Sequence, residues 1–145
     1  MSIRCEHAES IRVTPERVFA AIDDLALTPK WLPPCVSLSK VGSGPNKPGD
    51  KLHYVYKQGG KTGEMSGQIL AREPGKRLHC VYEDSTFKVS VDLLVAPENG
   101  GTLSTHIIEI TPKRFFMGLM SPLIRMGLKK QTLEAAGNLK KLLES

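Results

Sequence analysis

The first thirty residues change from a strand pattern to a helix pattern. In residues 3–13 apolar positions recur at every second residue, which is typical of a half-buried strand. Thr14 is then placed to cap a helix, and Pro15 suits its first turn, where a missing N–H costs nothing. The pattern therefore predicts a strand and a short helix. A second short helix is expected around residues 24–28, before Pro29.

A series of strand patterns fills the middle of the chain. Each apolar, alternating segment ends at a cluster of Gly, Pro, Asn, Asp or Ser, and such short connections join neighbouring antiparallel strands. The six segments cover residues 36–41, 51–57, 64–73, 77–83, 87–96 and 102–110. With the first strand, the sequence predicts a curved antiparallel sheet of seven strands.

The last part of the chain has the pattern of one long helix. Ser121 is a plausible cap and Pro122 the first helical residue. One stripe at helical spacing comprises Ile124, Leu128, Thr132, Ala135, Leu139 and Leu142. The opposite stripe comprises Lys129, Lys130, Glu134, Lys140 and Lys141. The order of elements predicts an α+β fold in which the sheet wraps this helix, and residues 1–145 are long enough for one domain with its own core.

The net charge of +5 belongs to the end of the chain. Residues 1–111 hold 13 basic and 13 acidic side chains, whereas residues 112–145 hold 7 basic and 2 acidic ones. A surface that binds nucleic acid usually combines basic groups from several elements with aromatic residues or a groove-reading motif, and none is present. We therefore predict no nucleic-acid partner and interpret the lysines as a solvated helix face.

The sequence also indicates a compartment. The N-terminal residues carry charge at once, and the longest apolar stretch is too short to span a bilayer. Cys5, Cys35 and Cys80 lie far apart without a CxxC pair, which favours reduced thiols that serve packing. We expect a cytoplasmic protein.

Metal and cofactor chemistry has no sequence signal. The four histidines, His7, His53, His79 and His106, stand singly on different predicted strands, without the spacing of a metal site. A nucleophile elbow, a P-loop and a dinucleotide fingerprint are absent, and the glycines near residue 44 lie between strands. We predict neither a metal nor a cofactor.

Several segments, taken in their order, resemble a known superfamily. These are "IRVTPERVFAAIDDL", the "WLP" that follows the short helices, the "EPGKRL" turn and "GGTLSTH" before the last strand. The chain resembles the START-like (SRPBCC) superfamily, in particular its polyketide cyclase/dehydrase-like branch, with the birch-pollen allergen as a distant relative. The resemblance covers nearly the whole chain and implies a helix-grip fold. In that fold, the C-terminal helix closes a curved sheet over a deep, mostly apolar cavity.

The alternation of the strands predicts which side chains line such a cavity. The apolar face of each strand should point inward, with three tyrosine hydroxyls as its polar groups. Trp31, held between prolines, either closes one end of the cavity and touches the ligand or is only a core residue. The predicted ligand-binding residues are Trp31, Tyr54, Tyr56, Met65, Tyr82, Phe87, Phe116, Ile124 and Leu128.

Candidates for acid–base catalysis are few. In the last strand either His106 or Glu109 should point inward, because apolar residues occur on both of its faces. His7 and Glu9 share the parity of the apolar face of the first strand, so an acid/base pair in the cavity is conceivable. Taken alone, each of these residues is more often a hydrogen-bonded core residue than a catalytic one.

Three functions remain compatible with these observations. The first, which we favour, is binding or carriage of a hydrophobic small molecule such as a lipid, an isoprenoid or an aromatic polyketide. The second is a polyketide aromatase or cyclase that uses the same cavity. The third is lipid transfer at a membrane surface through the basic, apolar segment of residues 114–127, which alternatively only begins the long helix. Ligand identity, turnover and the choice between monomer and homodimer stay open.

Overall fold

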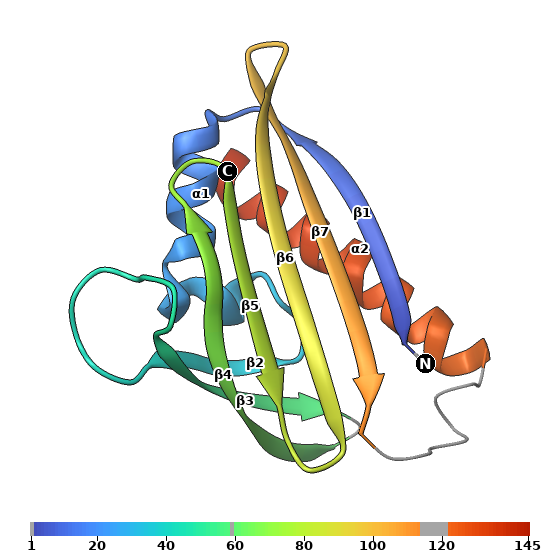
Figure 1. Cartoon of the computed structure of the whole chain (residues 1–145). Helices are drawn as coiled ribbons and strands as arrows, with labels where there is room; N and C mark the ends of the chain where they lie inside the picture. Colours follow the sequence, from blue (N-terminus) through green and yellow to red (C-terminus); the bar gives the residue numbers. More distant parts are fainter. Residues whose placement is uncertain (1, 59, 114–121) are drawn as a thin grey trace.

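One curved antiparallel sheet and one long helix dominate the molecule (Figure 1). The computed structural model describes residues 2–58, 60–113 and 122–145. The strands lie in the order β1-β7-β6-β5-β4-β3-β2. After β1 the chain therefore crosses to the opposite edge of the sheet at β2, adds β3 to β7 one after another, and places β7 beside β1. The helix α2 crosses one face of this sheet. The predicted helix-grip arrangement is confirmed.

The elements follow the predicted sequence of a strand, two short helices, six strands and a long helix. They are β1 (Ile3–Ile11), α1 (Pro15–Asp23), the 3₁₀ helix η1 (Leu25–Lys30), β2 (Cys35–Lys40), β3 (Lys51–Gln58), β4 (Lys61–Glu73), β5 (Arg77–Glu83), β6 (Phe87–Glu98), β7 (Gly101–Pro112) and α2 (Pro122–Glu144).

The start of α1 has the predicted chemistry, whereas the end of η1 does not. The Thr14 hydroxyl accepts a hydrogen bond from the Arg17 N–H at 3.4 Å, and Pro15 occupies the first turn. The second helix was expected to stop before Pro29, but η1 continues through Pro29 to Lys30. The prediction was wrong because the Thr28 carbonyl accepts the N–H groups beyond the proline, so the tight turn does not need a proline N–H.

The hairpin between β6 and β7 extends both strands beyond their predicted ends. Glu98 pairs with Gly101, and the two residues between them have positive φ angles, 43° at Asn99 and 82° at Gly100. An Asn-Gly pair with positive φ at both positions is typical of a type I′ turn, whose twist matches that of the strands. The turn residues therefore sustain the long β6–β7 ladder.

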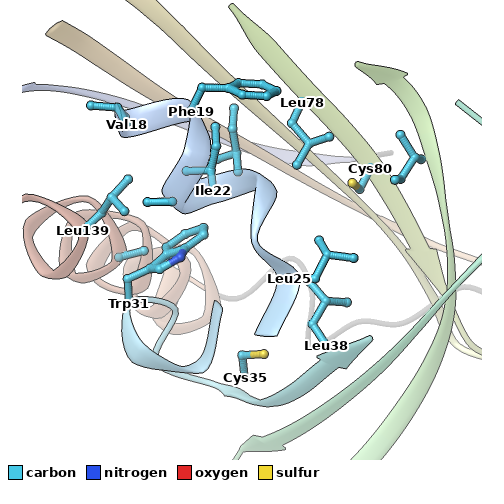
Figure 2. Packing of buried hydrophobic residues seen from close by; sticks show 14 of the residues in the cluster. Val18, Phe19, Ile22, Leu25, Trp31, Cys35, Leu38, Leu78, Cys80 and Leu139 are labelled. Atoms are coloured by element: carbon cyan, nitrogen blue, oxygen red, sulfur yellow. The ribbon is translucent and has the colours of Figure 1, made fainter. Parts of the chain in front are cut away.

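The core lies between the inner face of the sheet and the helices. Alternation is clear on β5, where Leu78, Cys80 and Tyr82 are buried. Figure 2 shows α1 and η1 packed over this face, with Leu78 and Cys80 opposite Ile22 and Leu25. The short helices thus cover one end of the sheet.

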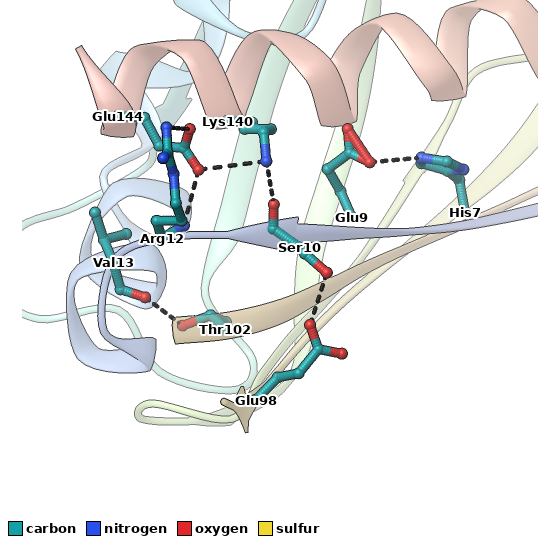
Figure 3. Close-up of polar contacts among 9 residues, drawn as sticks. All are labelled: His7, Glu9, Ser10, Arg12, Val13, Glu98, Thr102, Lys140 and Glu144. Atoms are coloured by element: carbon teal, nitrogen blue, oxygen red, sulfur yellow. Dashed lines mark hydrogen bonds and ion pairs between the residues drawn. The ribbon is translucent and has the colours of Figure 1, made fainter. Parts of the chain in front are cut away.

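Polar contacts fasten the end of α2 to β1 (Figure 3). The Arg12 N–H donates to the Glu144 carboxylate at 2.8 Å, and the Lys140 ammonium donates to the Ser10 carbonyl at 2.5 Å. Lys140 and Glu144 also form an ion pair at 3.4 Å. In the described residues no helix is long and apolar enough to cross a membrane.

Candidate functional site

A cavity of about 600 Å³ lies under the sheet. Its walls are the inner faces of β2 to β7, the α1–η1 segment and the N-terminal half of α2. This volume is in the range of sites for small organic ligands. The described lining residues are Ile22, Leu25, Thr28, Trp31, Leu32, Pro34, Leu38, Tyr54, Tyr56, Met65, Leu78, Cys80, Tyr82, Phe87, Val89, Val91, Leu93, Ile108, Ile110, Gly127, Leu128 and Gln131.

The cavity contains most of the side chains that the sequence selected. The selected residues that line it are Trp31, Tyr54, Tyr56, Met65, Tyr82, Phe87 and Leu128. Phe116 and the side chain of Ile124 lie outside the described residues. The same holds for residues 114–121 of the segment considered for membrane contact. That these residues bind a ligand, or that the segment meets a membrane, stays a prediction.

Two polar lining residues, Thr28 and Gln131, were not anticipated. Gln131 lies three residues after Leu128, so the helical stripe contained a signal for it. Thr28 had no such signal, because its position depends on the continuation of η1 past the following proline.

The three tyrosines gather on β3 and β5. Ring centroids are 5.8 Å apart for Tyr54 and Tyr56 and 5.1 Å apart for Tyr54 and Tyr82. The cluster follows from sheet register. Strand β4 lies between β3 and β5 and has a glycine opposite two of the rings: Gly63 pairs with Tyr56, and Gly67 pairs with Tyr82. A Cβ on either glycine would lie 2.5 Å from a ring atom. The two glycines therefore make room for the rings over β4.

The titratable groups of this part of the cavity are held in their neutral forms. Burial raises the pKa of Tyr54, with the neighbouring Cys35 and Tyr56 adding to the effect, and burial likewise raises the pKa of Tyr82 well above its usual range. Burial also raises the pKa of Cys80 to about 12. Neutral hydroxyl and thiol groups can orient a ligand, but at neutral pH they are not poised to exchange protons.

Trp31 is fixed by its backbone at the junction of η1 and β2. Its N–H donates to the Thr28 carbonyl at 3.1 Å, and its carbonyl accepts from the Asn138 side chain at 3.3 Å. The indole is 3% exposed and meets the His106 ring in an edge-on geometry, with centroids 5.7 Å apart. Trp31 is therefore both a core residue and part of the cavity wall, so the two alternatives from the sequence are compatible.

The acid–base candidates do not meet in the cavity. His106 is the inward residue of β7 and is 2% exposed, whereas Glu109 is on the opposite face of the strand. His7 and Glu9 contact each other at 3.3 Å, and Figure 3 shows both between β1 and α2. This pair, which the sequence made conceivable in the cavity, is not part of the described lining, because β1 is at the edge of the sheet and α2 covers its inner face.

The described part of the chain contains no candidate metal site. There, no group of three or more His, Cys, Asp or Glu side chains is arranged to hold a metal ion. The outward-facing histidines have protein partners: His53 contacts Glu64 at 3.0 Å, and His79 contacts Ser90 at 2.8 Å.

A family model agrees with this architecture over nearly the full sequence. Residues 2–144 match the model described as polyketide cyclase/dehydrase and lipid transport. The chain belongs to this family. The resemblance seen in the sequence segments is thus confirmed. No curated protein matches this chain in sequence.

Solved structures share the fold at low sequence identity. The structure of Zhui aromatase/cyclase from Streptomyces sp. R1128 is similar with a TM-score of 0.80 at 8% identity, over 99% of this chain and 94% of that one. A START superfamily protein from Mycobacterium smegmatis has a TM-score of 0.75 at 14% identity, over 97% and 99% of the two chains. For Ara h 8.0201 the TM-score is 0.74 at 18% identity, over 100% of both chains.

Proposed function

We propose that this protein binds and carries a hydrophobic small molecule in the cavity between its sheet and α2, without transforming it. The observation that carries the proposal is the lining itself. Among the described residues of the cavity wall there is no Asp, Glu, Lys, Arg or His, and most of the wall is aliphatic or aromatic. Such a wall favours a neutral, apolar ligand, because a buried charge would lack a compensating partner.

Family membership supports the same class of ligand. The description of the family combines polyketide cyclases and dehydrases with lipid transport, which are activities on hydrophobic molecules. The fold shared with the Zhui aromatase/cyclase keeps cyclisation as the alternative. Fold alone does not decide between binding and chemistry, so the choice depends on the side chains of the site.

The side chains favour binding over cyclisation. A cyclase or dehydratase needs a group that exchanges protons near neutral pH. The buried tyrosines and Cys80 retain their protons, since burial raises their pKa values. Burial, with a contribution from His7, lowers the pKa of the neighbouring His106 to about 4, so this imidazole is neutral.

Two measurements test the proposal. Native mass spectrometry of the freshly purified protein should show a retained apolar adduct or, after delipidation, uptake of one molecule of a medium-chain alcohol. The chain has one tryptophan, and Trp31 lines the cavity, so its emission should change in a saturable way as the alcohol binds.

A matched pair of variants on β6 locates the binding. Val91→Phe adds bulk inside the cavity, whereas Lys88→Phe adds the same ring on an exposed position of the same strand. We expect Val91→Phe to weaken binding of the alcohol about 10-fold or more and Lys88→Phe to leave it unchanged. Equal binding by both variants, or no binding of any apolar probe to the wild-type protein, would show that the cavity is not a ligand site.

A further inference from the structure

One side of the N-terminal half of α2 exposes large apolar side chains. Met126 is 65% exposed and Leu133 is 43% exposed. The two residues are seven positions apart, which is close to two turns of an α-helix, so they lie on the same side of α2. Single exposed apolar residues are common on protein surfaces, but two large ones that share a helix face indicate a contact surface.

Basic side chains flank these two apolar residues. Successive residues of an α-helix turn by about 100°, so Arg125 and Lys129 are on one flank and Lys130 is on the other. All three are exposed. Burial raises the pKa of the Cys5 thiol and the charges of Lys129 and Arg125 partly oppose this, which places both cations beside β1. Glu134 is 3.9 Å from Lys130, so it offsets one of the three positive charges.

No described element covers this side of α2. The helix packs mainly against β1, β7 and η1. Figure 1 shows it against one side of the sheet, so its other side faces away from the strands. We refer to Arg125, Met126, Lys129, Lys130 and Leu133 as the outer face of α2. Lysines alone are typical of a solvated helix face, whereas exposed apolar side chains between them are not.

The combination of charge and apolar surface selects one kind of partner. A second copy of the chain is disfavoured, because pairing the outer face with itself would bring cations against cations. A nucleic acid would use the cations but would leave Met126 and Leu133 in water. The surface of an anionic bilayer suits both groups, since it offers phosphates to the cations and an apolar boundary to the other two side chains.

We propose that the outer face of α2 docks on the surface of an anionic lipid bilayer. Its two apolar side chains enter the boundary between headgroups and acyl chains, and its three cations lie among the headgroup phosphates. This binding is separate from ligand binding in the cavity and goes beyond it. Gly127, Leu128 and Gln131 of the same turns form part of the cavity wall. Docking therefore brings the cavity within about one helix diameter, roughly 10–12 Å, of the bilayer.

The test measures cosedimentation of the intact wild-type protein with vesicles of two compositions. Vesicles of phosphatidylglycerol and phosphatidylcholine in equal parts have a negative surface, whereas vesicles of phosphatidylcholine alone do not. We expect binding to the anionic vesicles to be about 10-fold tighter or more. Raising the salt concentration from about 0.05 M to about 0.5 M should weaken this binding, because salt screens the attraction.

A charge-matched pair of variants assigns the binding to α2. Lys129→Gln combined with Lys130→Gln removes two positive charges from the outer face. Lys57→Gln combined with Lys61→Gln removes two from exposed positions of β3 and β4, near the opposite edge of the sheet. We expect the first variant to bind the anionic vesicles about 10- to 30-fold more weakly and the second to bind them nearly as the wild type does.

A second pair tests the apolar part of the outer face. Met126→Ser should weaken binding to the anionic vesicles about 3- to 10-fold, and Leu133→Ser should act in the same direction. Val41→Ser is the control, since Val41 is 68% exposed just after β2, and it should leave the binding unchanged. All the altered positions are exposed and outside the cavity lining, so each variant should remain folded and bind a medium-chain alcohol as the wild type does.

The outcomes separate this inference from the proposed function. Equal binding to both kinds of vesicle, no binding to either, or equal binding by the two lysine variants would overturn the membrane-docking face. So would unchanged binding by both Met126→Ser and Leu133→Ser, because the cations would then act without the apolar residues. A dimer in solution that Met126→Ser dissociates would assign the face to a second copy and overturn it as well. Alcohol binding is measured independently, so its absence in a protein that still binds anionic vesicles would overturn only the proposed function.

Discussion

The two halves of α2 meet the rest of the molecule in different ways. In the C-terminal half, Ala135, Ala136 and Leu139 have no exposed surface, and two of them belong to the main core cluster. In the N-terminal half, Gly127, Leu128 and Gln131 form part of the cavity wall. One helix therefore serves as a packed core element at one end and as the roof of a cavity at the other.

Polar contacts accentuate this difference. Arg12 and Ser10 of the β1 end bond to Glu144 and Lys140 of the packed half of α2, as Figure 3 shows. A cavity forgoes close contacts that would otherwise stabilise the fold. The contrast teaches that one end of the helix supplies stability, while the other end leaves a cavity open.

The largest expected effect tests the packing of the two halves directly. Leu139→Ala should lower the free energy of unfolding by about 4 kcal/mol, because it opens a void in a tightly packed region. Leu128→Ala should cost only about 2 kcal/mol, since the removed atoms already border a cavity. Denaturant titrations of both variants measure the difference. Equal losses would show that the two halves are packed alike.

The next effect concerns the wall beneath the tyrosines. A Cβ at Gly67 would clash with the buried ring of Tyr82, whereas a Cβ at Gly63 would clash with the less buried ring of Tyr56. We expect Gly67→Ala to destabilise by about 1–3 kcal/mol and Gly63→Ala by less, because only the Tyr56 ring has space to move. Thermal unfolding of the two variants measures the difference in stability. A larger loss of stability for Gly63→Ala would mean that the Tyr82 ring moves aside more easily than the Tyr56 ring.

The regular parts of this architecture were readable because their signals are local. Alternation placed Tyr54, Met65 and Tyr82 on the inner face, and the structure has all three in the cavity wall. Thr14 and Pro15 likewise marked the start of α1. Each signal depends on a residue and its near neighbours, so one sequence is enough to interpret it.

The parts that could not be read depend on contacts between distant segments. Alternation left β7 undecided between His106 and Glu109 because apolar residues occur on both faces. Only the packing of Trp31 and α2 against β7 identifies the buried face. The location of His7 under α2 rather than in the cavity follows from the edge position of β1. The contact of Trp31 with His106 joins a loop to a strand, for which periodicity has no signal.

A third prediction concerns the ion pair that holds α1 against the sheet. Arg72 donates two hydrogen bonds to the Asp23 carboxylate, at 2.9 and 2.8 Å. Burial by itself would raise the pKa of Asp23, but hydrogen bonds from Arg72 and Asn46 and the nearby positive charges outweigh it and lower this pKa below 3.8. Arg72→Gln should therefore destabilise the protein by about 1–2 kcal/mol at neutral pH.

The pH dependence of this effect has a definite sign. A carboxylate with a lowered pKa in the folded state stabilises that state fully above its unfolded value, and the contribution is lost as the pH falls through the folded value. The stability difference between wild type and Arg72→Gln should thus be constant near neutral pH and shrink below pH 3.8. Urea titrations across this range measure it. A difference that grows with acidification would contradict the assignment.

The smallest expected effect separates the cavity wall from the packed core. Tyr54→Phe removes one hydroxyl from the cavity wall and keeps the ring that stacks with Tyr56. If this hydroxyl bonds to the ligand, affinity should fall by about 0.5–1.5 kcal/mol while the free energy of unfolding of the empty protein hardly changes. Leu139→Ala should do the reverse at a temperature where it remains folded, because Leu139 is in the core cluster but not in the cavity wall. Calorimetric titration and denaturant unfolding of both variants give the four values required. If the core variant loses affinity as strongly as the tyrosine variant, then binding depends on the rigidity of the packed half, and the division of labour along α2 does not hold.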